Sequence, residues 1–155
     1  MYHCGFIFSD YVSGYIQVRH QVALGASETT YDKFNYEIYV SYARLLIQAY
    51  HTENGSFASK YFMSQVISNN RQISFREVGA SHQNGVAERG FKTITNMART
   101  MLIHASIKNP QVNITAYLCL VDINHVICIY NIIPRKTSGL SPLELWYRSS
   151  FLYTK

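Results

Sequence analysis

The stretch SHQNGVAERGFKTITNMARTMLIHAS, residues 81–106, says most about the fold of this chain. Its first residues are polar and lead into Asn84-Gly85, a pairing typical of turns and loops. From Val86 to Ser106 apolar residues recur every three or four positions, and this spacing predicts a long amphipathic helix. We expect the core face of that helix to carry Phe91, Ile94, Ala98, Met101 and Ala105.

A second face of the same predicted helix carries charge. Glu88, Lys92, Thr95 and Arg99 follow one another at intervals of four, three and four, so they share one side of the helix. A DNA strand crossing this side would meet two cations that bind phosphates. The other interpretation is an ordinary Glu–Lys pair on a solvated surface, worth a few tenths of a kcal/mol, roughly.

The rest of the chain alternates strand and helix patterns, which predicts an α/β layer structure. An apolar run ending at Asp10 and an alternating run from Tyr15 to His20 predict a hairpin. A helix is expected over 28–48, with an inward stripe of Phe34, Ile38, Tyr42 and Leu45. Further strands are expected near 45–50 and 72–75, further helices near 56–69 and 113–130, and a short amphipathic segment at 143–147.

Composition narrows the class of protein. The 155 residues suit one domain, and the net charge of +5 suits a polyanionic partner such as nucleic acid. The chain has three cysteines and no C-x-x-C pair, which argues against a disulfide framework and against a zinc finger. The same cysteine pattern favours an intracellular compartment. The most apolar stretch, 114–133, contains Asp122, Asn124 and His125, so we expect no membrane span.

Three acidic residues stand at the ends of predicted elements. Asp10 ends the first strand, Glu53 precedes an Asn-Gly turn, and Glu88 opens the long helix. Fixed carboxylates that converge on one sheet edge are what two-metal phosphoryl transfer needs. Each acid taken singly is equally well read as a turn-former or a helix-dipole partner. Spacing alone leaves these alternatives open.

Four segments carry a resemblance to one family. The segment His51-Thr-Glu-Asn-Gly-Ser-Phe57 is similar to the "H-T-D-N-G-x-F" of integrases from copia-type retrotransposons, and Ser81-His-Gln-Asn-Gly-Val-Ala-Glu-Arg89 to their "H-H-Q-N-G-V-A-E-R". Met97-Ala-Arg-Thr-Met-Leu102 matches their "M-A-R-T-M-L". Asn131-Ile-Ile-Pro134 followed by Gly139-Leu-Ser-Pro-Leu-Glu-Leu-Trp146 resembles their closing motif, so the resemblance spans nearly the whole chain.

The resemblance implies an RNase H-like fold, a mixed five-stranded sheet flanked by helices, over residues 1–147. It implies truncation at the N-terminus and a C-terminal tail at 148–155. It also implies DNA integration by strand transfer, with two Mg²⁺ or Mn²⁺ ions held by Asp10, Glu53 and Glu88 as catalytic and metal-binding residues. The DNA-binding residues would be Lys92, Arg99, Asn84 and Gln83. The implied partners are element ends and target DNA, with a homo-oligomer as the acting form and the nucleus as its place of action.

One departure from the family bears on activity. Glu53 stands where the family has Asp, and its side chain is one methylene longer. Because Mg²⁺ tolerates geometric error poorly, this change is expected to impair the metal site. The two functions to separate are therefore an integrase core, with impaired strand transfer, and a catalytically inactive relic that acts only as a nucleic-acid-binding or interaction module.

Overall fold

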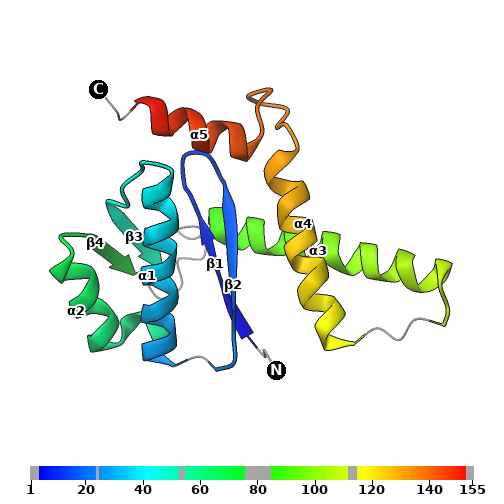
Figure 1. Ribbon diagram of the computed structural model, residues 1–155, viewed down its shortest axis with the longest axis horizontal. Coiled ribbons are helices and arrows are strands. Elements are labelled where there is room, and N and C mark those ends of the chain that lie inside the picture. Colours follow the sequence, from blue (N-terminus) through cyan, green and yellow to red (C-terminus); the bar gives the residue numbers. More distant parts are fainter. Residues whose placement is uncertain (1–3, 24, 53–54, 76–84, 112–114, 153–155) are drawn as a thin grey trace. The chain divides into compact units, whose positions relative to one another are not determined.

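Strands and helices alternate along the chain, as the sequence predicted (Figure 1). The computed structural model describes residues 4–23, 25–52, 55–75, 85–111 and 115–152. The elements are, in order, β1 (Cys4–Ser9), β2 (Ile16–Gln21), α1 (Ala26–Tyr42), β3 (Ala49–Thr52), the 3-10 turn η1 (Ser56–Ala58), α2 (Lys60–Ser68), β4 (Gln72–Phe75), α3 (Gly85–Lys108), α4 (Ala116–Ile132) and α5 (Pro142–Leu152).

The chain divides into two compact units. Unit 1 comprises Met1–Phe6, Arg19–Gly85 and Tyr147–Lys155, and unit 2 comprises Ile7–Val18 and Val86–Trp146. The turn of the β1–β2 hairpin therefore belongs to unit 2, together with α3 and α4. Unit 1 holds α1, α2 and the β3–β4 pair.

The prediction of a five-stranded sheet was wrong. The described strands form two sheets of two, β1–β2 and β3–β4. In the second, β3 and β4 run parallel, with Ala49 opposite Gln72 and Thr52 opposite Phe75. Local patterns in the sequence indicated four strand segments, and the number five came only from the resemblance. A four-residue strand such as β3 or β4 also offers few ladder hydrogen bonds to a further neighbour.

The core of unit 2 is formed where α3 and α4 pack against β2. Its buried members are the apolar side chains Ile16, Ile94, Ala98, Val126 and Ile127. A Cβ added to Gly90 would lie 2.7 Å from Cδ1 of Ile16, so a larger residue at this position would require the Ile16 side chain to shift. On α3 the prediction was right for Ile94 and Ala98 and wrong for Phe91, which is 58% exposed, and for Ala105, which is also exposed.

In unit 1, helix α1 has the predicted period but buries a different face. Phe34, Ile38 and Tyr42 are exposed, against expectation. The buried side chains recur instead at spacings of four, three and four, on a neighbouring face of the helix: Thr29, Lys33, Tyr36 and Val40. The helix also ends at Tyr42 rather than near residue 48, because Arg44 takes a left-handed conformation with φ of 58°. The sequence pattern identified the helix and missed its orientation.

Helix α2 ends within one residue of the prediction but begins at Lys60, four residues after the predicted start at 56, because the 3-10 turn η1 precedes it. Ser59 caps it, its hydroxyl accepting a hydrogen bond from the Phe62 backbone N–H at 3.2 Å. Phe62 and Val66 are fully buried, and the Phe62 ring packs against Phe57 with centroids 5.3 Å apart. Phe57 in turn meets Phe6 at 4.8 Å, so three aromatic rings join this helix to the first strand. Among the described residues, no helix is long and apolar enough to cross a bilayer.

Candidate functional site

The first acidic residue, Asp10, closes the β1–β2 turn. Its carboxylate oxygen Oδ2 accepts hydrogen bonds from both the backbone N–H and the hydroxyl of Ser13, each at 2.6 Å. The Asp10 backbone N–H donates to the Tyr15 carbonyl at 2.9 Å, and its carbonyl accepts from the Gly14 N–H at 2.8 Å. Gly14 has a φ of 65°, a left-handed conformation that favours glycine. The segment Asp10-Tyr-Val-Ser-Gly14 is therefore a complete turn motif.

The far side of this turn is held by the C-terminal part of unit 2. Arg135 donates from Nη2 to the Gly14 carbonyl at 3.2 Å and to the Tyr130 hydroxyl at 3.1 Å. Tyr15 stacks on the buried Trp146 ring, with centroids 4.9 Å apart. The hairpin turn is thus held by Arg135 and Trp146, which lie far from it in the sequence.

The Asn131 side chain forms hydrogen bonds with the backbone of β2, as a neighbouring strand would. Its amide oxygen accepts from the Ile16 N–H at 3.0 Å, and its amide nitrogen donates to the Ile16 carbonyl at 2.8 Å. Both residues are buried, so this one side chain satisfies two backbone groups that water does not reach. The sequence reasoning used Asn131 only as part of a motif and missed this role.

Glu144 and Ser141 together cap the N-terminus of helix α5. The Ser141 hydroxyl accepts from the Glu144 backbone N–H at 3.2 Å, while the Glu144 carboxylate accepts from the Ser141 N–H and hydroxyl, both at 2.8 Å. This reciprocal arrangement is a capping box, and Pro142 occupies the first helical position. The signal Ser-Pro-Leu-Glu was present in the sequence and would have identified the helix start.

Glu88, the second candidate metal-binding acid that the structure describes, lies on helix α3. Glu88 lies in the first turn and is half-buried. Lys92, Thr95 and Arg99 follow it on the same side of the helix and are all exposed. Among the described residues, neither Lys92 nor Arg99 takes part in an ion pair or a hydrogen bond of its side chain, so both cations are available to phosphates. The structure therefore provides the charged face that the spacing predicted.

The third acid and two predicted DNA contacts lie outside the described residues. These are Glu53, Gln83 and Asn84. Asp10 and Glu88 both belong to unit 2, whereas Glu53 follows β3 in unit 1. The convergence of the three carboxylates stays a prediction. Within the part of the chain that the structure describes, no three His, Cys, Asp or Glu side chains form a group that could hold a metal ion.

The chemistry of the two described acids fits a hard cation. Carboxylate oxygens are the donors that Mg²⁺ prefers. Both hydrogen bonds to the Asp10 carboxylate fall on Oδ2, and Oδ1 accepts none from the described residues. One oxygen of Asp10 can hold the turn while the other is offered to a ligand.

The strand that leads to Glu53 is anchored by a buried polar network in unit 1. Lys33, only 2% exposed, pairs with the Glu37 carboxylate at 3.1 Å. The Tyr50 hydroxyl, on β3, donates to the same oxygen at 2.8 Å. Burial, and secondly the Glu37 charge, raise the pKa of Tyr50 above its ordinary range, so the phenol remains a donor.

Comparisons with known proteins show what the fold resembles. The chain is similar to the HTLV-2 integrase catalytic core domain solved in complex with magnesium, with a TM-score of 0.65 and 19% identity for a trimeric form and 0.63 and 19% for a dimeric form. Each match covers 92% of this chain and 83% of the viral one.

A second solved structure gives the same result. The chain matches a simian T-cell lymphotropic virus intasome in complex with the PP2A regulatory subunit B56 gamma, with a TM-score of 0.68 and 15% identity. That match covers 90% of this chain and 46% of the other. No protein-family model and no curated protein sequence matches the chain. At these identities the likeness concerns architecture: the chain has the mixed α/β fold of retroviral integrase catalytic cores.

Proposed function

We propose that this chain is an integrase-type core, of copia-type retrotransposon descent, that binds DNA and supports DNA integration. The observation that carries the proposal is the exposed face of α3, where Glu88 is followed by Lys92 and Arg99, on a fold shared with integrase catalytic cores. The motif around Glu88 supports the copia-type assignment. Oligomeric forms of the HTLV-2 core support self-association of this chain.

The proposed reaction is strand transfer, in which a DNA 3′-hydroxyl attacks a phosphodiester. Asp10, Glu53 and Glu88 would hold two Mg²⁺ or Mn²⁺ ions. When bound, these would activate the attacking hydroxyl and stabilise the leaving oxygen. Lys92 and Arg99 would hold the DNA backbone along α3, with Gln83 and Asn84 beside them, and Ser13 would fix the orientation of the Asp10 carboxylate. Chromosomal target DNA would place this activity in the nucleus.

A second candidate is a catalytically inactive core that keeps the fold and binds nucleic acid. Two observations favour it. The Asp10 carboxylate closes a turn, which is a sufficient structural reason for that residue. Glu53 is one methylene longer than the Asp of the family motif. In this form the cations of α3 would still bind phosphates, because that interaction needs no metal.

Strand transfer on short duplex ends separates the two candidates. With Mn²⁺ as the cofactor, we expect Glu53→Asp to raise product formation, by up to about a hundredfold if the longer side chain displaces its carboxylate by about 1 Å. Glu88→Gln should abolish the reaction, as should removal of the metal with a chelator. Glu28→Gln, an exposed acid in the first turn of α1, is the matched control and should leave the rate unchanged.

Each outcome decides between the candidates. Activity that depends on Glu88 and on metal supports the integrase core. If neither the parent chain nor Glu53→Asp forms product while both bind duplex DNA, the inactive nucleic-acid-binding core is supported instead. A chain that folds and binds no DNA at low salt contradicts both proposals.

A further inference from the structure

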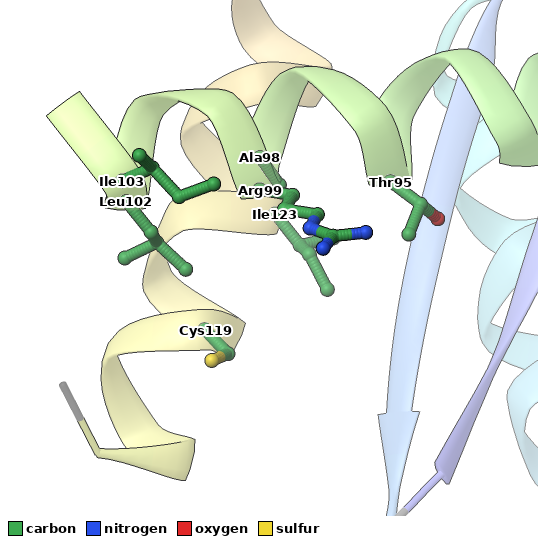
Figure 2. A pocket seen from close by; sticks show the side chains of 7 residues that line it. All are labelled: Thr95, Ala98, Arg99, Leu102, Ile103, Cys119 and Ile123. Atoms are coloured by element: carbon green, nitrogen blue, oxygen red, sulfur yellow. The ribbon is translucent and has the colours of Figure 1, made fainter.

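Unit 2 contains an open cavity between α3 and α4 whose lining shares Thr95 and Arg99 with the charged face of α3. It has a volume of about 420 Å³ and is lined by Thr95, Ala98, Arg99, Leu102, Ile103, Cys119 and Ile123. Figure 2 shows Leu102, Ile103 and Arg99 reaching into the space from α3, with the Cys119 sulfur facing it from α4. The volume falls within the range of small-molecule sites, roughly 300–1,000 Å³.

The lining is apolar with one charged group. Ala98, Leu102, Ile103 and Ile123 form walls suited to an aliphatic or aromatic body. Arg99 is the only ionisable cation among the lining residues, and none of them is acidic. Arg99 is exposed, and among the described residues no carboxylate pairs with it.

The charge pattern limits the kind of ligand. A guanidinium pairs with a carboxylate through two parallel hydrogen bonds, which fix the orientation of the anion. A phosphate dianion would find only this one cation in the lining, with the Thr95 hydroxyl as the one further N–H or O–H donor among the lining side chains. A nucleic-acid backbone needs a row of cations rather than apolar walls. A single carboxylate on an apolar body matches both features.

We propose that this cavity binds a small apolar monocarboxylate, an aryl or alkyl acid, with its body between α3 and α4 and its carboxylate on Arg99. The proposal uses neither Asp10 nor Glu53 nor Glu88, and it shares only Arg99 and Thr95 with the charged face of α3. Ligand binding would shield the Cys119 thiol, which lines the cavity and is half-buried, and would leave the exposed Cys128 on the same helix unaffected.

Thiol protection tests the site directly. The full chain is alkylated with iodoacetamide in the presence of 1-naphthylacetate, and the rate at each cysteine is read from its peptide by mass spectrometry. We expect the Cys119 rate to fall at least about fivefold at saturation and the Cys128 rate to stay constant. Equal protection of both thiols, or none at Cys119 up to millimolar ligand, overturns the proposal.

The role of Arg99 is tested by a matched pair of ligands and a matched pair of variants. Arg99→Gln should weaken 1-naphthylacetate about tenfold, equivalent to about 1.4 kcal/mol, and leave the neutral 1-naphthaleneethanol unchanged. Lys108→Gln removes one charge from the exposed end of the same helix, away from the cavity, and should change neither affinity. Equal weakening by the two variants, or of the two ligands, would show that Arg99 is not the carboxylate partner.

Discussion

At the scale of the residue, Asp10 has two possible roles: it closes a turn, and it is a candidate metal ligand. The place of Asp10 at the end of a predicted strand suggested a metal ligand, and the structure shows a carboxylate that holds a turn through Ser13. The turn explains why Ser13 and Gly14 belong to the same motif: one donates to the carboxylate, and the other supplies the left-handed backbone. A metal role requires the same acid but does not by itself require those neighbours.

Two substitutions at Asp10 separate the turn from the metal. Asp10→Asn keeps an oxygen that accepts from Ser13 and removes the charge, whereas Asp10→Ala removes the acceptor. We expect Asp10→Ala to lower the free energy of unfolding in urea by about 1–3 kcal/mol, because two donors of Ser13 lose their partner. Asp10→Asn should remain close to the parent in stability.

The same pair of variants then reports on metal binding. If Asp10 is also a ligand, Asp10→Asn should lose Mn²⁺-dependent strand transfer while staying folded. A stable Asp10→Asn that keeps the activity leaves Asp10 with the turn alone. The turn interpretation itself is refuted if Asp10→Asn is as unstable as Asp10→Ala.

At the scale of the element, local sequence patterns located helices well and their orientation less well. The bounds of α3 agree with prediction to within two residues, whereas α2 begins at Lys60, four residues after the predicted start at 56, because Ser59 caps it. Helix α1 has two candidate faces. It buries Lys33, which hydropathy alone would place in solvent, because Glu37 and Tyr50 compensate the charge. The Glu37 partner is local, at i,i+4, but the Tyr50 hydroxyl comes from β3, so the pattern of the helix alone does not contain the whole network.

Asn131 is the element-scale contact whose loss we expect to be most destabilising. Asn131→Ala leaves both the N–H and the carbonyl of Ile16 buried without a partner, and so should lower the free energy of unfolding by at least about 2 kcal/mol. Asn96→Ala, an exposed asparagine on α3, is the control and should change it by less than about 0.5 kcal/mol. Urea unfolding followed by circular dichroism measures both. Equal stability of the two variants would mean that water replaces the amide at β2.

At the scale of the whole molecule, sequence reasoning reached the class of fold but not the sheet. Four strand segments were predicted, and four are described, yet their pairing into two sheets of two was not foreseen. Strand pairing depends on contacts between distant segments, such as Ala49 with Gln72, which no local pattern contains. For the candidate site, too, local patterns predict one part and contacts between distant segments decide the other. The α3 face follows from spacing within one helix, whereas convergence of Asp10, Glu53 and Glu88 depends on three separate elements.

The net charge of +5 also acts at this scale, because it attracts any polyanion whether or not a specific surface exists. Lys92→Ala should weaken duplex DNA binding to a similar degree across sequences and reduce the slope of log K against log salt by about 1, since one phosphate contact is lost. Lys108→Ala is the control: it removes the same charge from the same helix, about 160° around its axis from Lys92. Fluorescence anisotropy between low and moderate salt measures both slopes. If the two variants reduce the slope equally, the attraction arises from net charge and α3 has no dedicated DNA-binding face.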